Sequence, residues 1–501
     1  MVKNIFKFIM ALSFALLALL GAAFLQDIKE TAKVETKKIQ VEKLNQDHSN
    51  DIVNKDYNLP IVIIDSEGKS IERYNKISAN ISIYDNKDGE SPLSNDPQIV
   101  SEANVKIRGN STSKYPKKQY AIELVNKKGE ENKQRVLGMK RNSDWVLNGP
   151  FADKSLIRNY IALKTSRNIM DYAPNVKFCE VFLLDDNSKS IDEKHYRGVY
   201  IMIEKIKRDD DRVDITKSLD NLSETSFILA KDRQRENDVS ISTYGKETYL
   251  YNNGFNVVYP KNSLTEEKYN YIEKHISEFE RILYSGKFND PINGYEKYID
   301  VDSFVDFYII NEFFKNTDAG MYSTYIYKDY EEKIKAGPVW DFNRSLGNYN
   351  NEIEKDFDYT GFFMNSRPWF NRLSEDINFS KKVKERYKEL RNTYLSDDYL
   401  LEFIDKTVVE LGDAPKRNFN KWDIKICNQA EVFEENGDVF DNYLSDVSKY
   451  EEFLDNNQHL LKSTSNKAQS FEEEISLMKN FIVNRGKWID ENIDTLNKWA
   501  K

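Results

Sequence analysis

The chain has 501 residues, of which 40% are hydrophobic and 13% aromatic, so it can bury a sizeable core and is not a disordered polymer. Its formal net charge of −10, from 83 acidic and 73 basic residues, gives no footprint for binding nucleic acid. The two cysteines, Cys179 and Cys427, and four scattered histidines exclude a disulfide framework and a cysteine-based zinc site. A single bridge between the two cysteines remains open. Carboxylates must hold any metal, which favours magnesium or manganese.

Residues 1–27 have the pattern of an export segment. Lys3 and Lys7 form a positive start, and residues 8–25 are uncharged and mainly apolar. This pattern predicts a signal peptide or, if it stays uncleaved, an N-terminal membrane anchor. The rest of the chain is then expected to be extracytoplasmic, secreted or held at the membrane. A polar stretch, residues 28–57, is expected to be a linker.

Residues 58–260 are predicted to form a β-rich domain. Short runs rich in β-branched and aromatic residues indicate strands. They lie at residues 59–64, 79–84, 104–108, 118–125, 178–184 and 197–206. One segment differs, because apolar residues from 153 to 163 recur at helical spacing and Asp153 is a suitable N-cap.

Residues 261–501 are predicted to be mainly helical. Thr265 is a fair N-cap before an amphipathic stretch, and Ser470 with Glu473 fits a capping box. The expected fold class is therefore α+β, with a β-rich first half and a helical second half that contains one strand pair.

That strand pair is the most informative stretch. Tyr, Thr and Ile residues favour strands at 322–328 and 334–339, and a short polar turn joins them into a hairpin. A hairpin returns the chain to its start, so Asp318 before it and Asp341 after it can lie side by side. Phosphoryl transfer uses such a pair, one to orient the attacking hydroxyl and one to hold a metal. Alternatively, the two are ordinary aspartates at strand ends.

A lysine at the start of another strand is a second candidate. Lys118 shares a strand face with the apolar residues Tyr120, Ile122 and Leu124, so its ammonium can point inward at the mouth of a cleft. An inward lysine that reaches nucleotide phosphates is what a kinase needs. The alternative is a lysine that extends from a strand end into solvent.

Two further charged residues accompany this lysine. Arg108 precedes the loop 109–112 and is expected to pair with phosphate or with a structural carboxylate. Glu204 ends an apolar strand and is expected either to partner Lys118 or to be a plain strand-end glutamate.

The sequence resembles the CotH family, the spore-coat protein H relatives, which are atypical kinases. The order and spacing of several short motifs match over roughly residues 58 to 500. The motifs are 108–112, 116–118, 153–159, 198–204, 316–318, 323–325, 337–342 and 346–348.

The resemblance implies a two-lobed, kinase-like fold with an ATP cleft between the lobes. It implies Asp318 as the catalytic base, Asp341 as a metal ligand for magnesium or manganese, and Lys118 as a contact to the nucleotide phosphates. Asn343 stands where the family often has a second acid. Its amide oxygen can still bind a cation.

The expected function is that of an ATP-dependent protein kinase acting on Ser, Thr or Tyr of spore-coat or cell-surface proteins. Kinase-like folds can also transfer AMP. A different class stays open, a surface-displayed structural or adhesive coat protein whose kinase-like site is idle. Paired carboxylates also suit carbohydrate hydrolysis, but a lysine beside them argues against it.

Overall fold

The computed structural model describes residues 56–85, 93, 95–234, 238–348, 358–435, 461 and 467–499. The expected export segment, residues 1–27, and nearly all of the linker, residues 28–57, lie outside the described residues. Within these described ranges, no helix combines the length and the apolar character that a membrane crossing requires.

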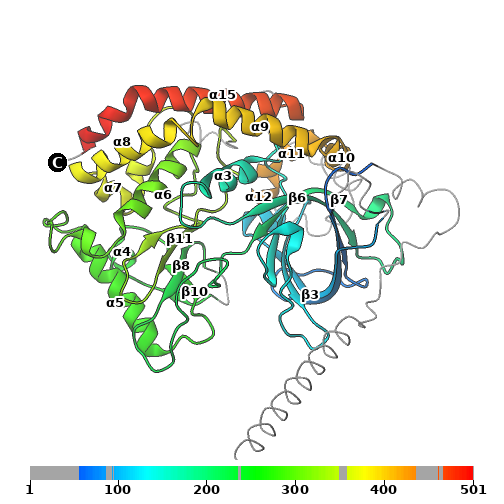
Figure 1. Ribbon diagram of the computed structural model, residues 1–501, viewed down its shortest axis with the longest axis horizontal. Helices are drawn as coiled ribbons and strands as arrows, with labels where there is room; N and C mark the ends of the chain where they lie inside the picture. The colour runs from blue at the N-terminus through cyan, green and yellow to red at the C-terminus, as the bar shows by residue number, and fades with distance from the viewer. Residues whose placement is uncertain are drawn as a thin grey trace, which may run out of the picture.

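The first half of the chain forms a closed seven-stranded barrel, seen on the right of Figure 1. Its strand order is β1-β2-β3-β4-β5-β7-β6, and the parallel pairing of β1 with β6 closes it. The strands are β1 Ile61–Asp65, β2 Ile77–Tyr84, β3 Ile99–Arg108, β4 Gln119–Val125, β5 Asp144–Asn148, β6 Val176–Leu184 and β7 Tyr196–Glu204. The sequence predicted all of these except β5.

The barrel interior confirms the predicted alternation. Tyr120, Ile122 and Leu124 of β4 are buried in one cluster with Val62 and Ile64 of β1. Alternate residues of a strand point to one face, so the face that Lys118 begins is the inside of the barrel.

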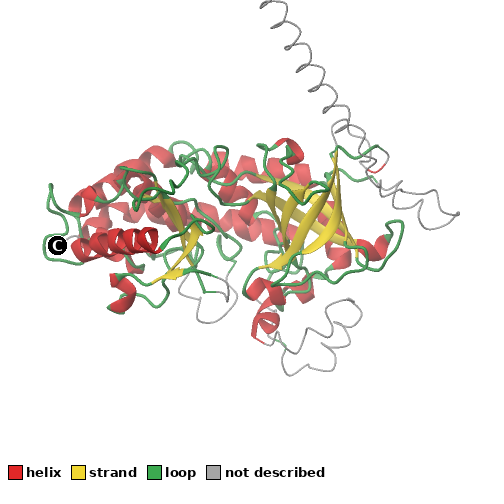
Figure 2. Cartoon of the chain, turned by 90° about the horizontal axis from the view of Figure 1, so that it is seen from below, coloured by secondary structure: helices red, strands yellow, loops and turns green. Residues whose placement is uncertain are grey.

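A second, smaller sheet has the strand order β12-β11-β8-β10-β9 and stands apart from the barrel in Figure 2. Its strands are β8 Phe227–Lys231, β9 Ser240–Ile241, β10 Phe255–Tyr259, β11 Thr324–Lys328 and β12 Lys335–Ala336. Ile326 pairs with Ala336 in the antiparallel β11–β12 hairpin, which confirms the predicted strand pair. Strand β8 pairs with β11 on its other side, so three strands that precede residue 260 share a sheet with this hairpin.

Helices account for most of the second half. Within the described part of the second half, the α-helices are α5 Glu266–Leu283, α6 Val301–Phe314, α7 Phe370–Leu373, α8 Ile377–Arg391, α9 Asp397–Leu411, α10 Ala414–Lys421, α11 Ile424–Cys427, α12 Ala430–Glu435 and α15 Phe471–Asn492, and the 3-10 helices are η5 Tyr295–Lys297, η7 Met364–Ser366 and η9 Ile493–Trp499. The described first half adds the α-helices α3 Arg158–Ser166 and α4 Tyr244–Glu247 and the 3-10 helices η2 Ser111–Lys114, η3 Val136–Gly138 and η4 Glu193–His195. Both predicted N-caps are confirmed, since Thr265 accepts from the N–H of Lys268 and Ser470 from that of Glu473. The Glu473 carboxylate accepts the N–H of Gln469 and not that of Ser470, so the expected capping box forms only in its Ser470 half.

The helix expected from Asp153 begins later, at Arg158. Leu156 has a left-handed backbone with φ 63°, which a right-handed helix cannot contain. The Asp153 carboxylate instead accepts from the N–H groups of Ser155 and Arg158 and so forms a turn ahead of the helix.

Figure 1 shows how the two halves are joined. Helix α3 lies between the barrel and the second sheet, and α9 and α15 run along the top. The sheet residues Phe227 and Ile326 share one core with Phe279 of α5 and Phe304 of α6. The α+β class is confirmed. Both cysteines are buried and free, so the bridge left open by the sequence is not formed.

Candidate functional site

Asp318 lies in a tight turn between helix α6 and strand β11. Lys315 ends α6 in a left-handed conformation with φ 51°, which turns the chain sharply. The carbonyl of Asp318 accepts the N–H groups of Met321 at 3.1 Å and Tyr322 at 2.8 Å. The turn is thereby closed by backbone hydrogen bonds, and Asp318 within it is half-buried.

Asp341 follows β12 and has a left-handed backbone with φ 61°. Aspartate, like asparagine, adopts this conformation more readily than most other non-glycine residues. The N–H of the next residue, Phe342, donates to Asn159 Oδ1 at 2.7 Å. Asn159 in turn donates to Asn148 Oδ1 at 3.2 Å. Helix α3 therefore fixes the peptide that carries Asp341.

Arg158 holds the rest of this loop, residues 341–348. Its Nε donates to the carbonyl of Ser345 at 3.0 Å and its Nη2 to that of Leu346 at 3.2 Å. Arg158 is itself buried and pairs with Asp153 at 2.6 Å and Glu474 at 2.7 Å. The motif at 153–159 thus supports the loop mechanically, a role that sequence reasoning did not assign.

The hairpin brings the two candidate acids into electrostatic contact. Burial, and then the negative charges of Asp318 and Asp232, raise the pKa of Asp341 from 3.8 to about 7. The cations Arg108 and Arg344 act in the opposite direction. Carboxylates that repel each other in this way are typical of sites that bind a cation or transfer a proton.

Arg108 reaches this site from the barrel. It is the last residue of β3, and its guanidinium carbon lies 5.1 Å from the centre of the Trp340 ring. Trp340 immediately precedes Asp341, so the cation is placed beside the acid. Across the β3–β4 ladder Arg108 pairs with Gln119, which puts Lys118 on the adjoining strand just beyond it.

Lys117 and Lys118 directly precede strand β4, and their side chains point in opposite directions. Lys118 is half-buried and its Nζ donates to the carbonyl of Ser113 at 2.7 Å, which ties it to the η2 turn. Lys117 is fully buried on the outer face, where its Nζ donates to Asn418 Oδ1 at 2.7 Å. Burial lowers the pKa of Lys117 to about 7.

Of the two expectations for Glu204, a partner of Lys118 or a strand-end glutamate, the strand register supports the second, since Glu204 is the last residue of β7. Glu204 pairs with Arg212, with 3.0 Å between Oε1 and Nη1. The unpredicted strand β5 separates β4 from β7, and Glu204 lies opposite Trp145, which lies opposite Ile122. Four residues of extended chain separate Ile122 from Lys118, about 13 Å along the strand.

Sequence reasoning also missed two residues beside the acids. Asp232 follows β8, whose last residue pairs with Thr324 of β11, and its charge acts on Asp341. Arg367 donates from Nη2 to the carbonyl of Thr317 at 2.6 Å. Neither lies in a local motif, and only the pairing of β8 with β11 could have indicated Asp232.

The donor atoms fit a hard cation. The side-chain oxygens of Asn343 and Asn316 are buried and have no hydrogen-bond partner. Among the described residues, no group of three or more His, Cys, Asp or Glu side chains could hold a metal alone. Magnesium in phosphoryl-transfer sites typically uses one or two carboxylates and completes its shell with water and phosphate oxygens. One carboxylate of the pair and an amide oxygen suit that mode.

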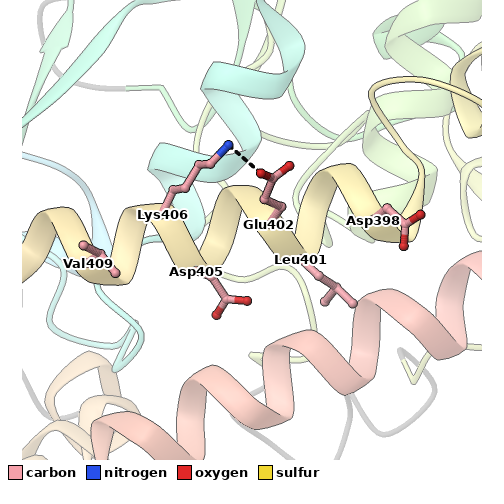
Figure 3. A pocket seen from close by; sticks show the side chains of 6 residues that line it. All are labelled: Asp398, Leu401, Glu402, Asp405, Lys406 and Val409. Atoms are coloured by element: carbon pink, nitrogen blue, oxygen red, sulfur yellow. Dashed lines mark ion pairs between the residues drawn. The ribbon is translucent and has the colours of Figure 1, made fainter.

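A separate hollow of about 630 Å³ lies on helix α9, away from these residues. Figure 3 shows that Glu402 and Lys406 form an ion pair along the helix, at 2.7 Å. The lining is completed by Asp398, Leu401, Asp405 and Val409. Three acidic side chains against one lysine give this hollow a net negative charge that does not suit nucleotide phosphates, and it contains none of the candidate site residues.

The fold and site define an α+β protein in which two aspartates flank a hairpin and a barrel arginine lies beside the second of them. The sequence model of the CotH kinase protein family matches residues 105–489, most of the chain, including Arg108, Lys118, Asp318 and Asp341. The chain therefore belongs to the CotH kinase protein family. No curated protein matches it.

Proposed function

We propose that this protein is an ATP-dependent protein kinase that phosphorylates Ser, Thr or Tyr of spore-coat or cell-surface proteins. The observation that carries the proposal is the coupling of Asp318 with Asp341, faced by Arg108 from the barrel. The barrel and the sheet-and-helix half would then be the two lobes of a kinase-like fold. Family membership supports the same reading.

Asp318 would serve as the catalytic base. Its carboxylate accepts the proton of the acceptor hydroxyl as that oxygen forms a bond to the γ-phosphorus of ATP. The bond from this phosphorus to the β–γ bridging oxygen breaks, and ADP leaves with the electron pair. Arg108 and Lys118 would bind the nucleotide phosphates through their positive charges.

Asp341 and Asn343 would hold magnesium or manganese. When bound, this cation neutralises negative charge on the nucleotide phosphates. The chain's contribution is to present a carboxylate and an unpartnered amide oxygen on a loop that Asn159 and Arg158 fix. The raised pKa of Asp341 reflects repulsion from Asp318 and Asp232. A bound cation would relieve this repulsion, which favours its binding.

The place of action would be outside the cytoplasm. The export pattern of residues 1–27 supports secretion or anchoring to a membrane. ATP would have to be supplied there, unless the protein works inside a spore compartment or mother cell. The partners would be the nucleotide and an acceptor protein of the coat or surface.

Labelled ATP tests this function directly. The full chain, purified in mild detergent, should transfer label from γ-labelled ATP to itself or to a Ser/Thr/Tyr-rich acceptor when magnesium or manganese is present. Asp341→Asn should abolish metal-dependent nucleotide binding. Asp318→Asn should spare that binding and stop transfer.

Two results would count against it. Label transferred from α-labelled ATP would indicate AMP transfer instead. If ATP with millimolar metal causes no shift in melting temperature, the surface-displayed, non-enzymatic alternative is favoured.

A further inference from the structure

Arg367 lies against the turn that carries Asp318, although it is 49 positions further along the chain. Its Nη2 donates to the carbonyl of Thr317, the residue directly before Asp318, at 2.6 Å. Its guanidinium carbon lies 5.3 Å from the centre of the Phe363 ring. The head group is thus directed by both a hydrogen bond and an aromatic face.

The aliphatic stem of the same side chain packs on the other end of the turn. A Cβ added to Gly320 would lie only 2.7 Å from Arg367 Cβ and 3.0 Å from its Cγ. Gly320 also has a positive φ of 81°, so glycine is required there both by conformation and by space. Arg367 therefore contacts the turn on both sides of Asp318.

The segment that carries Arg367 is anchored to the helix that leads into the same turn. Glu312 of α6 accepts the N–H of Met364 at 2.8 Å and that of Phe363 at 3.2 Å. Glu312 also forms a buried ion pair with Arg485 of α15. The position of Arg367 is consequently fixed relative to α6, whose end leads directly to Asp318.

We propose that Arg367 is the positioning residue of Asp318, holding its turn so that the carboxylate faces the acceptor hydroxyl. This inference rests on the proposed kinase function. Arg367 does not act on the nucleotide; it acts through the backbone of Thr317 and the packing of Gly320. Burial lowers the pKa of Arg367 and the charge of Asp318 opposes this, which places the guanidinium within electrostatic range of the carboxylate.

Three variants separate positioning from simple support. Arg367→Met keeps an aliphatic stem under Gly320 but loses the donor to Thr317. Arg367→Lys keeps one donor and the charge. Arg372→Met is the matched control, because Arg372 also donates to backbone carbonyls, at 3.1 and 2.8 Å, and stacks on a ring, but away from the site.

Kinetics give the first test. Arg367→Met should lower kcat about 100-fold while KM for ATP changes less than about twofold, because a misplaced base slows transfer without altering nucleotide binding. The kcat of Arg367→Lys should lie between those of Arg367→Met and the wild type. The kcat of Arg372→Met should equal that of the wild type. A kcat within about threefold of wild type, a parallel loss of ATP binding, or an equal loss in Arg372→Met would overturn the inference.

Hydrogen exchange gives a second test that needs no activity. In the full chain without nucleotide, Arg367→Met should speed exchange of the Met321 and Tyr322 amides, which bond to the Asp318 carbonyl. Exchange in the barrel strands should not change. If the wild type transfers no phosphate, the proposed function fails, yet this measurement still decides the role of Arg367, and unchanged exchange in the turn refutes it.

Discussion

Asn159 Oδ1 accepts the backbone N–H of Phe342 at 2.7 Å, and this single bond ties helix α3 to the residue that follows Asp341. Both groups are buried, so neither can exchange the bond for water. A helix inserted between the barrel and the second sheet thus determines where the candidate metal ligand stands.

Replacing Asn159 by Leu should loosen this loop. The Phe342 N–H and the Asn148 side chain would both lose their partner, at about 1–3 kcal/mol of unfolding free energy. We expect about tenfold weaker binding of ATP with manganese, measured by calorimetry alongside denaturant unfolding. Asn168→Ala, at the exposed end of the same helix region, is the control and should change neither quantity. Unchanged ATP binding in Asn159→Leu would contradict this support of the loop.

The two adjacent lysines should separate in function. Lys118→Met should weaken ATP binding about tenfold or more, because an ammonium at the barrel mouth would be lost from the phosphates. Lys117→Met should leave ATP affinity within about twofold and instead change the unfolding free energy, by about 1–3 kcal/mol, since it removes one of the donors to Asn418 Oδ1, which also accepts the N–H of Val199. Fluorescent nucleotide titration with parallel thermal unfolding distinguishes the two. Reversed results would move the phosphate contact to Lys117.

Local sequence patterns were sufficient for the hairpin and its flanking acids. Tyr, Thr and Ile residues around a polar turn favour two strands wherever the segment lies, so the approach of Asp318 to Asp341 follows from chain geometry. The face of Lys118 followed from alternation in the same way.

What depends on long-range pairing could not be predicted. Strand β5 was missed, and its insertion between β4 and β7 is what separates Glu204 from Lys118. Asp232 reaches the site because β8 pairs with β11, which no local pattern specifies. Arg367 depends on an anchor formed by Glu312 and Arg485, residues far apart in sequence.

The raised pKa of Asp341 predicts a pH-dependent stability without metal. Burial and the charges of Asp318 and Asp232 raise it from 3.8 to about 7, so the native state binds more protons than the unfolded state between these values. Stability from this group is therefore lost as pH rises from about 4 to 7. The shift corresponds to about 4 kcal/mol, reduced to about 1–3 kcal/mol by partial solvation.

Asp341→Asn should remove this dependence. The variant should melt at a higher temperature than the wild type at pH 8 with chelator present, and the gap should close near pH 4. Asp220→Asn, whose side chain is 95% exposed, is the control and should follow the wild type. If the melting temperatures of Asp341→Asn and the wild type differed by the same amount at every pH, repulsion at Asp341 would not be the cause of the difference.

The Asn343→Asp substitution should lower the stability of the metal-free protein but strengthen metal-dependent ATP binding. Its Oδ1 is buried without a partner, while Asn348 fixes its backbone by donating to the Asn343 carbonyl at 2.7 Å. Asn343→Asp adds a negative charge near Asp341, so the metal-free protein should lose stability because like charges repel in a poorly solvated site. With manganese present, the new carboxylate can bind the cation. The manganese concentration that gives half-maximal ATP binding should therefore fall about tenfold.

Thermal melts with chelator and manganese titrations of ATP binding provide both halves of this test. Asn343→Leu is the matched comparison, because it removes the unpartnered oxygen without adding charge. It should stabilise the metal-free protein and weaken manganese-dependent ATP binding. A change of the same sign under both conditions in Asn343→Asp would mean that this oxygen is not directed at the cation, and Asp341 alone would then supply the protein's ligand.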